Sequence, residues 1–492
     1  MEILQSAVLP AQVDADLLVL LAAGPAPALE LDSALGGRLG RLIGSEELTT
    51  DRGQSLLLHL AGEISAPRLI VVGIGARVDV DAEAMRCAGA EAARAGAGVG
   101  GTIAFALDPS LPLGLADQAA ALAEGIVLAT FDSARWKSRK QESRAFTRLV
   151  LLGGNDAAVA AAGRSTTIAG WVNTARLFVA APPNEFTPAA VGDEALGIAG
   201  RLADVSVAVL EPDELAAQGF GGIVAVGGAA ANGPRLVTLH YRPQTAKSGI
   251  RLGLVGKAVT FDSGGYFLKP SASIGAEKAD MAGGAAVLAA LGAIAELRLP
   301  LEVIAVIPAA ENALGTGAYR PGDILTMASG RTVEISNPDA EGRLLLADAL
   351  THVQRLGATH LVDVATLTGA VIQALGDYYA GVFANDDSWR DTIVAAGETS
   401  GDRAWPLPLD PRYRSMVESQ LADLRNSPAG GTRAVLLYSA YFIREFAGDG
   451  PWAHIDIAGM RLLTEARGYY RPGPTGYGVR LLVELATQLS GA

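Results

Sequence analysis

Two segments of this chain gather charged side chains among glycines and alanines. The first is LVGKAVTFDSGGYFLKPSASIGAEKAD, residues 254–280, and the second is NPDAEGR, residues 337–343. Carboxylates that are brought together in a fold repel one another unless cations hold them. Oxygen-rich sites without cysteine or histidine suit Mg²⁺ or Mn²⁺, and Zn²⁺ also accepts such ligands. The two segments therefore predict a metal site at the carboxylates Asp262, Asp280, Asp339 and Glu341. Lys257, Lys269 and Arg343 are the other charged residues singled out in these segments.

The second segment also has a structural explanation that covers part of it. Asparagine is a good helix N-cap, proline suits the first helical position, and acidic residues in the first turn complement the helix dipole. That explanation leaves out Arg343, and it leaves out Gly342, because a glycine inside a helix costs stability.

The first segment has structural alternatives of its own. Asp262 would serve in an ordinary turn before Ser-Gly-Gly, Asp280 would serve as a helix N-cap, and the two lysines would serve as ion-pair or surface residues. A phosphate loop is excluded because GKA lacks the upstream glycine and the following Ser or Thr. No G-x-S-x-G elbow indicates a serine hydrolase. The histidines lie outside both segments, and we interpret them as structural: His59, His240, His352, His360 and His454.

The composition excludes several classes of protein. A chain of 492 residues that is 50% hydrophobic can bury a large core and form two domains. A net charge of −13 argues against general nucleic-acid binding, which needs clustered Lys and Arg. The single Cys87 excludes an intrachain disulfide and fits a reducing compartment. The N-terminal apolar run is short and is interrupted by Pro10 and Asp14, and no apolar run is free of Gly, Pro or charge over a membrane-spanning length. We therefore expect a cytoplasmic protein.

The pattern of apolar runs predicts two α/β domains, a smaller N-terminal one and a larger one with a mixed sheet covered by helices. In the first third, short apolar runs alternate with alanine-rich helical segments such as 81–97, which is typical of a parallel sheet. The strands predicted there are 17–22, 69–75, 102–107 and 149–154. A G-x-G in VVGIGARVD lacks the third glycine of a nucleotide loop, and we reject it as one.

A helical stretch from residue 158 leads into APPNEFTP, whose prolines mark a boundary. The predicted organisation is an N-terminal domain over 1–157, a linker helix over 158–176 and a catalytic domain over 177–492. Helices are expected near 281–297 and 339–356, and strands at 235–241, 251–256, 301–309, 360–367 and 454–459. Both charged segments then follow buried strands, where open α/β sheets place their ligands.

The two segments resemble the leucyl (cytosol) aminopeptidase family of dinuclear metallopeptidases. The family signature is Asn-Thr-Asp-Ala-Glu-Gly-Arg-Leu, and this chain departs from it only at Pro338. The order and spacing of the seven charged residues also follow the family. The likeness covers about residues 170–490 well and the first 160 loosely, and its further motifs are APPNEFTP, PAAEN (308–312), AYRPGD (318–323), ATLTGA (365–370) and WAHIDIAG (452–459).

The resemblance implies a ligand set for two divalent ions per subunit. Asp262 and Glu341 would bridge the ions, Lys257 and Asp280 would complete one site, and the side chain and carbonyl of Asp339 would complete the other. The ions implied are Mn²⁺ or Zn²⁺, with Mg²⁺ and Co²⁺ as alternatives. A lysine ligand must be neutral, which costs about 4–5 kcal/mol at pH 7, and an adjacent dication can offset that cost.

The resemblance also implies how a peptide is cleaved. The two ions would activate a water for attack on the peptide carbonyl, Lys269 would stabilise the oxyanion, and a bicarbonate held by Arg343 would act as general base. The backbone of Leu367 and Gly369 orients the substrate amine and the neighbouring peptide. Gly342 leaves room for a close approach. The family assembly implied is a homohexamer with the catalytic domains at its centre.

One residue near the site departs from the family. Relatives usually carry methionine three residues before Asp280, lining the pocket for the first side chain of the substrate, whereas this chain has Glu277. A carboxylate in an apolar pocket needs a partner. We therefore expect a basic or polar first residue to be accepted better than in relatives. The alternative is that Glu277 turns toward Lys278 or solvent.

Two other functions would use similar residues. A dinuclear phosphoesterase also uses carboxylate-bound metal pairs, but such sites often recruit histidines and these segments have none. Assays with an amino-acid anilide and a nitrophenyl phosphate separate the two. A non-catalytic scaffold or DNA-binding member of the fold would show no turnover with saturating Mn²⁺. With all seven charged residues present in an acidic chain, the prediction is a metal-dependent aminopeptidase that acts on peptides.

Overall fold

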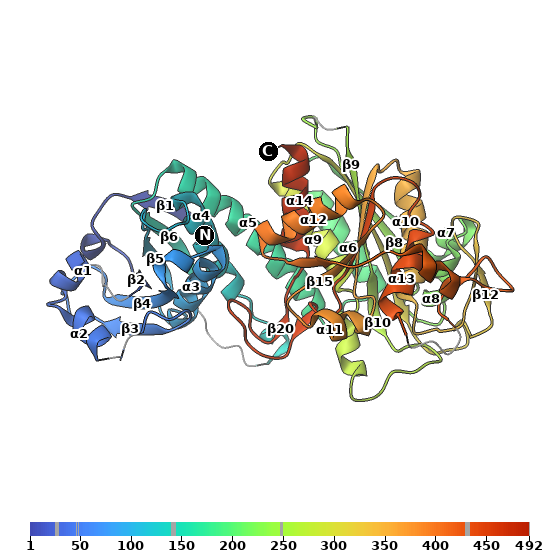
Figure 1. The fold of residues 1–492 in the computed structure, drawn as a ribbon, viewed down its shortest axis with the longest axis horizontal. Coiled ribbons are helices and arrows are strands. Elements are labelled where there is room, and N and C mark those ends of the chain that lie inside the picture. Colours follow the sequence, from blue (N-terminus) through green and yellow to red (C-terminus); the bar gives the residue numbers. More distant parts are fainter. Residues whose placement is uncertain are drawn as a thin grey trace. The chain divides into compact units, whose positions relative to one another are not determined.

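The computed structural model describes residues 1–24, 29–45, 47, 49–138, 144–246, 249–428 and 433–491. The chain forms two compact units (Figure 1). Unit 1 is Met1–Asn173 with Thr464–Gly473, and unit 2 is Thr174–Leu463 with Pro474–Ala492. The boundary falls inside helix α5 (Asp156–Ala180), which includes the helix predicted as a linker. The sequence-based division did not anticipate that 464–473 belongs to unit 1, because no change of composition marks this segment.

Unit 1 is built on a six-stranded sheet of order β1-β6-β5-β2-β4-β3. Neighbouring strands are parallel except β3 and β4. The strands are β1 (Glu2–Ser6), β2 (Leu17–Ala23), β3 (Ser55–His59), β4 (Arg68–Gly75), β5 (Gly101–Ala106) and β6 (Phe146–Leu152). The helices before α5 are α1 (Leu29–Ala34), α2 (Arg38–Gly44), α3 (Ala82–Ala95) and α4 (Leu115–Ala129). The predicted strands correspond to β2, β4, β5 and β6, because strands covered on both faces are continuous apolar runs. The antiparallel edge strand β3 was not predicted.

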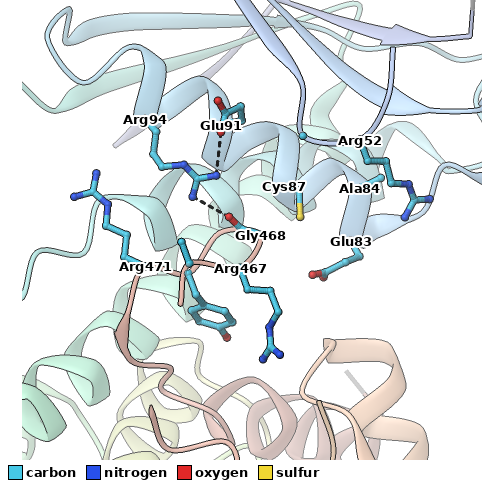
Figure 2. A pocket seen from close by; sticks show the side chains of 12 residues that line it. Arg52, Glu83, Ala84, Cys87, Glu91, Arg94, Arg467, Gly468 and Arg471 are labelled. Carbon is cyan, nitrogen blue, oxygen red and sulfur yellow. Dashed lines mark hydrogen bonds and ion pairs between the residues drawn. The ribbon is translucent and has the colours of Figure 1, made fainter. Parts of the chain in front are cut away.

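A pocket of about 520 Å³ lies within unit 1, between one face of α3 and the segment 464–473 (Figure 2). Its charged walls are tied together by internal contacts. Arg94 donates to Glu91 and to the carbonyl of Gly468, as Figure 2 shows. Burial raises the pKa of the Cys87 thiol to about 11, so this thiol stays protonated at neutral pH. The hydrogen bond from Arg94 to Gly468 attaches the segment 464–473 to α3.

Unit 2 is built on a nine-stranded mixed sheet of order β16-β15-β18-β14-β9-β11-β8-β7, with β10 paired to β11. The strands β18, β14, β9 and β11 run parallel, and β7, β8 and β15 pair antiparallel with their neighbours β8, β11 and β18. The mixed sheet confirms the predicted fold class. Its strands are β7 (Val205–Leu210), β8 (Arg235–Tyr241), β9 (Arg251–Gly256), β10 (Ala258–Asp262), β11 (Glu302–Asn312), β14 (His360–Ala365), β15 (Ala380–Ala384), β16 (Ala404–Pro406) and β18 (Trp452–Asp456).

Helices and two small sheets complete unit 2. The helices are α6 (Pro188–Arg201), α7 (Pro212–Ala217), α8 (Gly221–Gly227), α9 (Ala282–Glu296), α10 (Gly342–Arg355), α11 (Gly369–Leu375), α12 (Asp387–Ser400), α13 (Val435–Arg444) and α14 (Val479–Ser490). The small sheets are β12 (Ile324–Thr326), β13 (Thr332–Glu334) and β17 (Leu424–Arg425), and β19 (Leu462–Leu463) with β20 (Gly473–Pro474).

Helix α9 forms the centre of the core of unit 2. All its residues from Ala282 to Ala295 are buried, and it packs against β9, β11 and β14. Together with the 3-10 turn before it, this helix is the one stretch among the described residues that is long and apolar enough to cross a membrane. However, 94% of its apolar window is buried inside the structure, as in a core helix.

Candidate metal and catalytic site

The seven charged residues meet at the carboxyl ends of the parallel strands of unit 2. Lys257 directly follows β9, and Asp262 is the last residue of β10. Asp280 lies two residues before α9, and Asp339 and Glu341 lie just before α10. Segments far apart in the sequence therefore converge, as expected for a ligand site in an open α/β sheet.

The carboxylates form a compact buried cluster. Asp262, Asp280 and Glu341 each offer an oxygen, and these oxygens lie within 4.8 Å of one another. Each of the three residues is only 2% exposed. Within the described part of the chain, Glu341 Oε2 has no hydrogen-bond partner. Such an arrangement is unfavourable unless positive charge is supplied.

Two lysines supply part of that charge. Lys257 Nζ lies 2.8 Å from Asp280 Oδ2 and 2.8 Å from Glu341 Oε1. Lys269 Nζ lies 2.8 Å from Asp262 Oδ2 and 2.6 Å from Asp339 Oδ1. The four carboxylates outnumber the two ammonium groups, so the cluster keeps a surplus of negative charge.

The pKa values express the same imbalance. Burial raises the pKa of Asp280 to about 8, against the opposing effect of Lys257, and Glu341 adds to the rise. Burial, with Glu341 and Asp262, raises the pKa of Asp339 to about 7. Burial alone would lower the pKa of Lys257, but its carboxylate neighbours outweigh burial and the pKa rises. The oxygen-rich donor set and its surplus negative charge fit divalent ions.

Gly342 makes the approach of Lys257 possible. A Cβ atom on Gly342 would lie 2.6 Å from Cε and 2.7 Å from Nζ of Lys257, well inside van der Waals contact. Any other side chain at this position would displace the lysine from Glu341 and Asp280. The close approach of Lys257 explains why residue 342 is glycine, although glycine is unfavourable within a helix.

Helix α10 begins later than predicted. It starts at Gly342, with Glu341 at its N-cap position, and not at 339. Asn337 does not cap it, because the Asn337 side chain accepts from the N–H of Asp339 in a local turn. Side chains from two other segments hold that turn by donating to the carbonyl of Pro338: Asn312 Nδ2 at 3.1 Å and Tyr319 Oη at 2.6 Å.

Asn312 and Tyr319 are site residues to which the sequence reasoning gave no role. Asn312 ends β11, and its amide also donates to Asp262 Oδ1 at 2.9 Å, so it joins this metal-ligand candidate to the turn that precedes Asp339. Tyr319 is buried. Their signal was present in the motifs PAAEN and AYRPGD, which had been matched to the family without a function for each residue.

The turn after β14 links the cluster to the expected substrate groups. Thr366 Oγ1 donates to Asp280 Oδ1 at 2.6 Å, and the Thr366 carbonyl accepts from Lys257 Nζ at 3.1 Å. Asp456, at the end of β18, accepts from the N–H of Leu367 at 3.2 Å and from Thr368 Oγ1 at 2.7 Å. The N–H of Leu367 is thus bonded within the protein, and Asp456 is a third supporting residue to which sequence reasoning gave no role.

Arg343 is buried on the first turn of α10. Its Nη1 donates to the carbonyl of Asn426 at 2.5 Å, and its guanidinium lies 5.4 Å from the ring centroid of Tyr438. Among the described residues its Nε has no hydrogen-bond partner. Burial lowers the pKa of Arg343, although arginine remains charged at neutral pH.

Glu277 already has a cationic partner inside the protein. Its carboxylate accepts from Arg461 at 3.0 and 2.8 Å in a bidentate pair. Lys278, the partner considered in the sequence analysis, donates instead to the carbonyl of Ala180. Arg461 Nη1 also lies 3.9 Å from Asp280 Oδ1. The expectation that Glu277 needs a substrate cation to balance its charge is therefore corrected, because Arg461 provides that charge.

One of the five histidines is fully buried. Nδ1 of His454 lies 2.5 Å from Asp363 Oδ1 on the neighbouring strand, and the other oxygen of Asp363 accepts from Trp452. Burial opposes a charged imidazole, but Asp363 outweighs burial and raises the pKa of His454. The His454–Asp363 pair thus joins β14 to β18, the strand that ends with Asp456.

Both units of the chain are similar to proteins of one known family. Residues 173–483 match the model of the cytosol aminopeptidase family catalytic domain, and residues 20–140 match that of its N-terminal domain. A probable cytosol aminopeptidase of Roseiflexus castenholzii is 42% identical over 482 residues, with 96% of each chain covered. One of Solibacter usitatus is 40% identical, with 96% of this chain and 97% of the relative covered.

Two solved structures share the whole fold. The bottromycin maturation enzyme BotP in complex with Mn is 34% identical with a TM-score of 0.86, covering 97% of this chain and 100% of that one. A mutant of tomato leucine aminopeptidase is 31% identical with a TM-score of 0.87, covering 99% of this chain and 96% of that one. The chain thus belongs to the cytosol aminopeptidase family and is a metal-dependent exopeptidase that acts on peptides.

Proposed function

We propose that this enzyme releases the N-terminal residue of peptides at the cluster described above, with two divalent ions held by Lys257, Asp262, Asp280, Asp339 and Glu341. The observation that carries the proposal is the buried cluster in which carboxylates outnumber lysines. Bound ions would polarise the peptide carbonyl and lower the pKa of a water molecule. Lys257 must lose its proton to act as a ligand, so filling the site should release a proton.

Lys269 has the charge and the position to act on the reacting carbonyl. Its ammonium is held by Asp262 and Asp339, and its side chain is 19% exposed, so it faces an accessible part of the site. Burial would lower its pKa, but the carboxylates outweigh burial and the pKa rises, which keeps the group charged. A fixed cation at this place stabilises the negative charge that develops on the carbonyl oxygen.

Arg343 is proposed to hold the anion that serves as general base. A buried guanidinium Nε without a partner among the described residues is a donor that a small anion can satisfy. Bicarbonate is the anion that the family likeness implies. This proposal is tested by measuring how kcat depends on added bicarbonate. The dependence should be absent in Arg343→Ala.

The turn after β14 is proposed to orient the substrate. Because the N–H of Leu367 donates to Asp456, the group of Leu367 that can meet a substrate amine is its carbonyl. Gly369 is the first residue of α11, where backbone N–H groups lack intrahelical partners and can donate to a peptide carbonyl.

The native ions are proposed to be Mn²⁺ or Zn²⁺, and the Mn complex of BotP supports the first of these. A homohexamer in the cytoplasm follows from the family likeness alone. Metal analysis of protein purified without added metal, together with its mass in solution, tests these proposals. The catalytic proposal is tested by activity on a panel of amino-acid amides, with a nitrophenyl phosphate as the contrasting substrate.

Replacing Pro338 with threonine is expected to change activity by no more than several-fold. Proline fixes φ and lacks an N–H, but the turn is held through the carbonyl of Pro338 by Asn312 and Tyr319, and threonine keeps that carbonyl. The measurement is kcat/KM for leucine amide in Pro338→Thr. A complete loss of activity would show that the turn depends on the proline ring itself.

The Glu277–Arg461 pair is proposed to set the preference for the first residue of the substrate. Glu277→Met should leave Arg461 beside Asp280 and favour acidic first residues, whereas Arg461→Leu should leave Glu277 and favour Lys or Arg. The double variant removes both charges and should favour Leu and Met. The measurement is kcat/KM for Glu, Leu, Met and Lys amides in all four proteins.

The decisive expectation is that the two single variants shift the Glu-to-Lys ratio of kcat/KM in opposite directions. A merely structural ion pair would lower activity toward all four amides alike, through loss of stability. Equal Glu-to-Lys ratios in both single variants would show that the pair does not contact the substrate.

A further inference from the structure

The aspartates of the cluster are oriented in different ways. Asp280 Oδ1 accepts a hydrogen bond from Thr366 Oγ1 at 2.6 Å, and Asp262 Oδ1 accepts one from a backbone N–H of the turn that follows it. Asp339 Oδ1 forms an ion pair with Lys269 at 2.6 Å, but no directional hydrogen bond from the described residues reaches this oxygen. The direction of the Asp339 side chain therefore depends chiefly on the backbone that carries it.

The turn that carries Asp339 is held by one buried amide side chain. Asn426 Oδ1 accepts from the N–H of Ser336 at 2.9 Å and from the N–H of Asn337 at 3.2 Å. Asn426 Nδ2 donates to the carbonyl of Asn337 at 2.7 Å and to the carbonyl of Ala340 at 3.4 Å. The side chain of Asn426 thus bonds the backbone on both sides of Asp339, and the residue is 0% exposed.

An asparagine at position 426 matches these partners. An amide presents an acceptor and two donors in one plane, whereas a carboxylate would place a second acceptor against the carbonyls of Asn337 and Ala340. Alanine would leave those buried groups without this partner. The backbone of Asn426 is also held, because its N–H donates to the carbonyl of Glu334 at 3.0 Å and its carbonyl accepts from Arg343. The amide therefore reaches the turn from a fixed support.

We propose that Asn426 is a positioning residue that aligns Asp339 as a metal ligand. This inference rests on the proposed function, because Asp339 is assigned there to one of the two ions. Asn426 supplies no ligand atom itself and acts by fixing the peptide groups before and after Asp339. Loss of such a supporting residue typically lowers metal affinity by about 10–100-fold. Lys257 and Asp280 are supported by Thr366 instead, so the loss should concern one ion and not both.

The test measures metal binding by the full-length protein directly. Metal-stripped wild type and Asn426→Ala are titrated with Mn²⁺, and the number of bound ions per chain and their affinities are measured. The wild type should bind two ions. Asn426→Ala should bind one ion with wild-type affinity and the other about 10–100-fold more weakly. Its turnover of leucine amide should recover when the Mn²⁺ concentration is raised by the same factor, which loss of the fold would not allow.

A milder variant and a matched control complete the test. Asn426→Ser keeps one polar atom but cannot reach both sides of the turn, and it should weaken the same ion. Asn385→Ala is the control, because the Asn385 amide also joins two segments of unit 2, donating to Gly450 at 2.9 Å and accepting from Trp452 at 2.8 Å. It should leave both affinities unchanged.

Three outcomes would contradict one or the other assignment. Two ions bound with wild-type affinity in both Asn426 variants would overturn the inference, as would equal weakening of both ions. Unchanged affinities in a folded Asn426→Ser would overturn it even if Asn426→Ala fails to fold. Failure of the wild type to bind two ions would contradict the proposed function itself and not the role of Asn426.

Discussion

Glu341→Gln is expected to lose nearly all turnover while the protein stays folded. Glu341 offers one oxygen to Lys257 and leaves the other buried without a hydrogen-bond partner among the described residues, so the second oxygen is available as a ligand. Glutamine keeps the shape but removes the charge that would hold two cations. Because the cluster has surplus negative charge, losing one charge should not destabilise the metal-free fold.

The same cluster predicts that metal removal abolishes activity. Chelation should reduce turnover of leucine amide to background, and Mn²⁺, Zn²⁺, Mg²⁺ or Co²⁺ should restore it in the wild type. Metal content per chain, measured with activity, should fall in Glu341→Gln. Glu302→Gln is the control, since Glu302 pairs with His240 and Arg242 outside the site. Full activity in a metal-stripped sample would contradict the mechanism.

Lys269→Ala is expected to lower kcat by about 10²–10³ with a much smaller effect on metal content. The proposed role of Lys269 is to stabilise charge on the substrate oxygen, which exists only during the reaction. Its loss also removes a cation from Asp262 and Asp339, and this should make those carboxylates better ligands. The effect should therefore lie in the chemical step and not in metal binding.

Two measurements separate the roles of the lysines. Lys257→Ala should lose metal, whereas Lys269→Ala should keep it and lose rate per bound metal. Lys278→Ala is a suitable control, because its amine donates to the carbonyl of Ala180 and not to the cluster. If Lys269→Ala instead loses its metals and keeps its rate per bound metal, the two lysines have been assigned the wrong way round.

Several features of this protein were determined by local sequence alone. The central strands β2, β4, β9 and β14 are continuous apolar runs because strands covered by helices on both faces exclude water. The residues of the cluster are recognisable because carboxylates and lysines are rare in such apolar surroundings. Metal binding by their carboxylate oxygens was predicted from residue type alone, whereas an amine ligand from Lys257 was implied only by the family resemblance.

Only the tertiary structure decided how these residues are supported. Arg461 neutralises Glu277 although the two residues are 184 positions apart in the sequence. No local pattern connects them. The start of α10 at Gly342 is set by Asn312 and Tyr319, which hold the preceding turn and override the capping tendency of Asn337. Local propensities differ by about 1 kcal/mol or less between ordinary residues, so buried contacts between distant segments outweigh them. The residues of the site could therefore be predicted from the sequence. The residues that support them, and the geometry of the site, depend on tertiary contacts between distant segments.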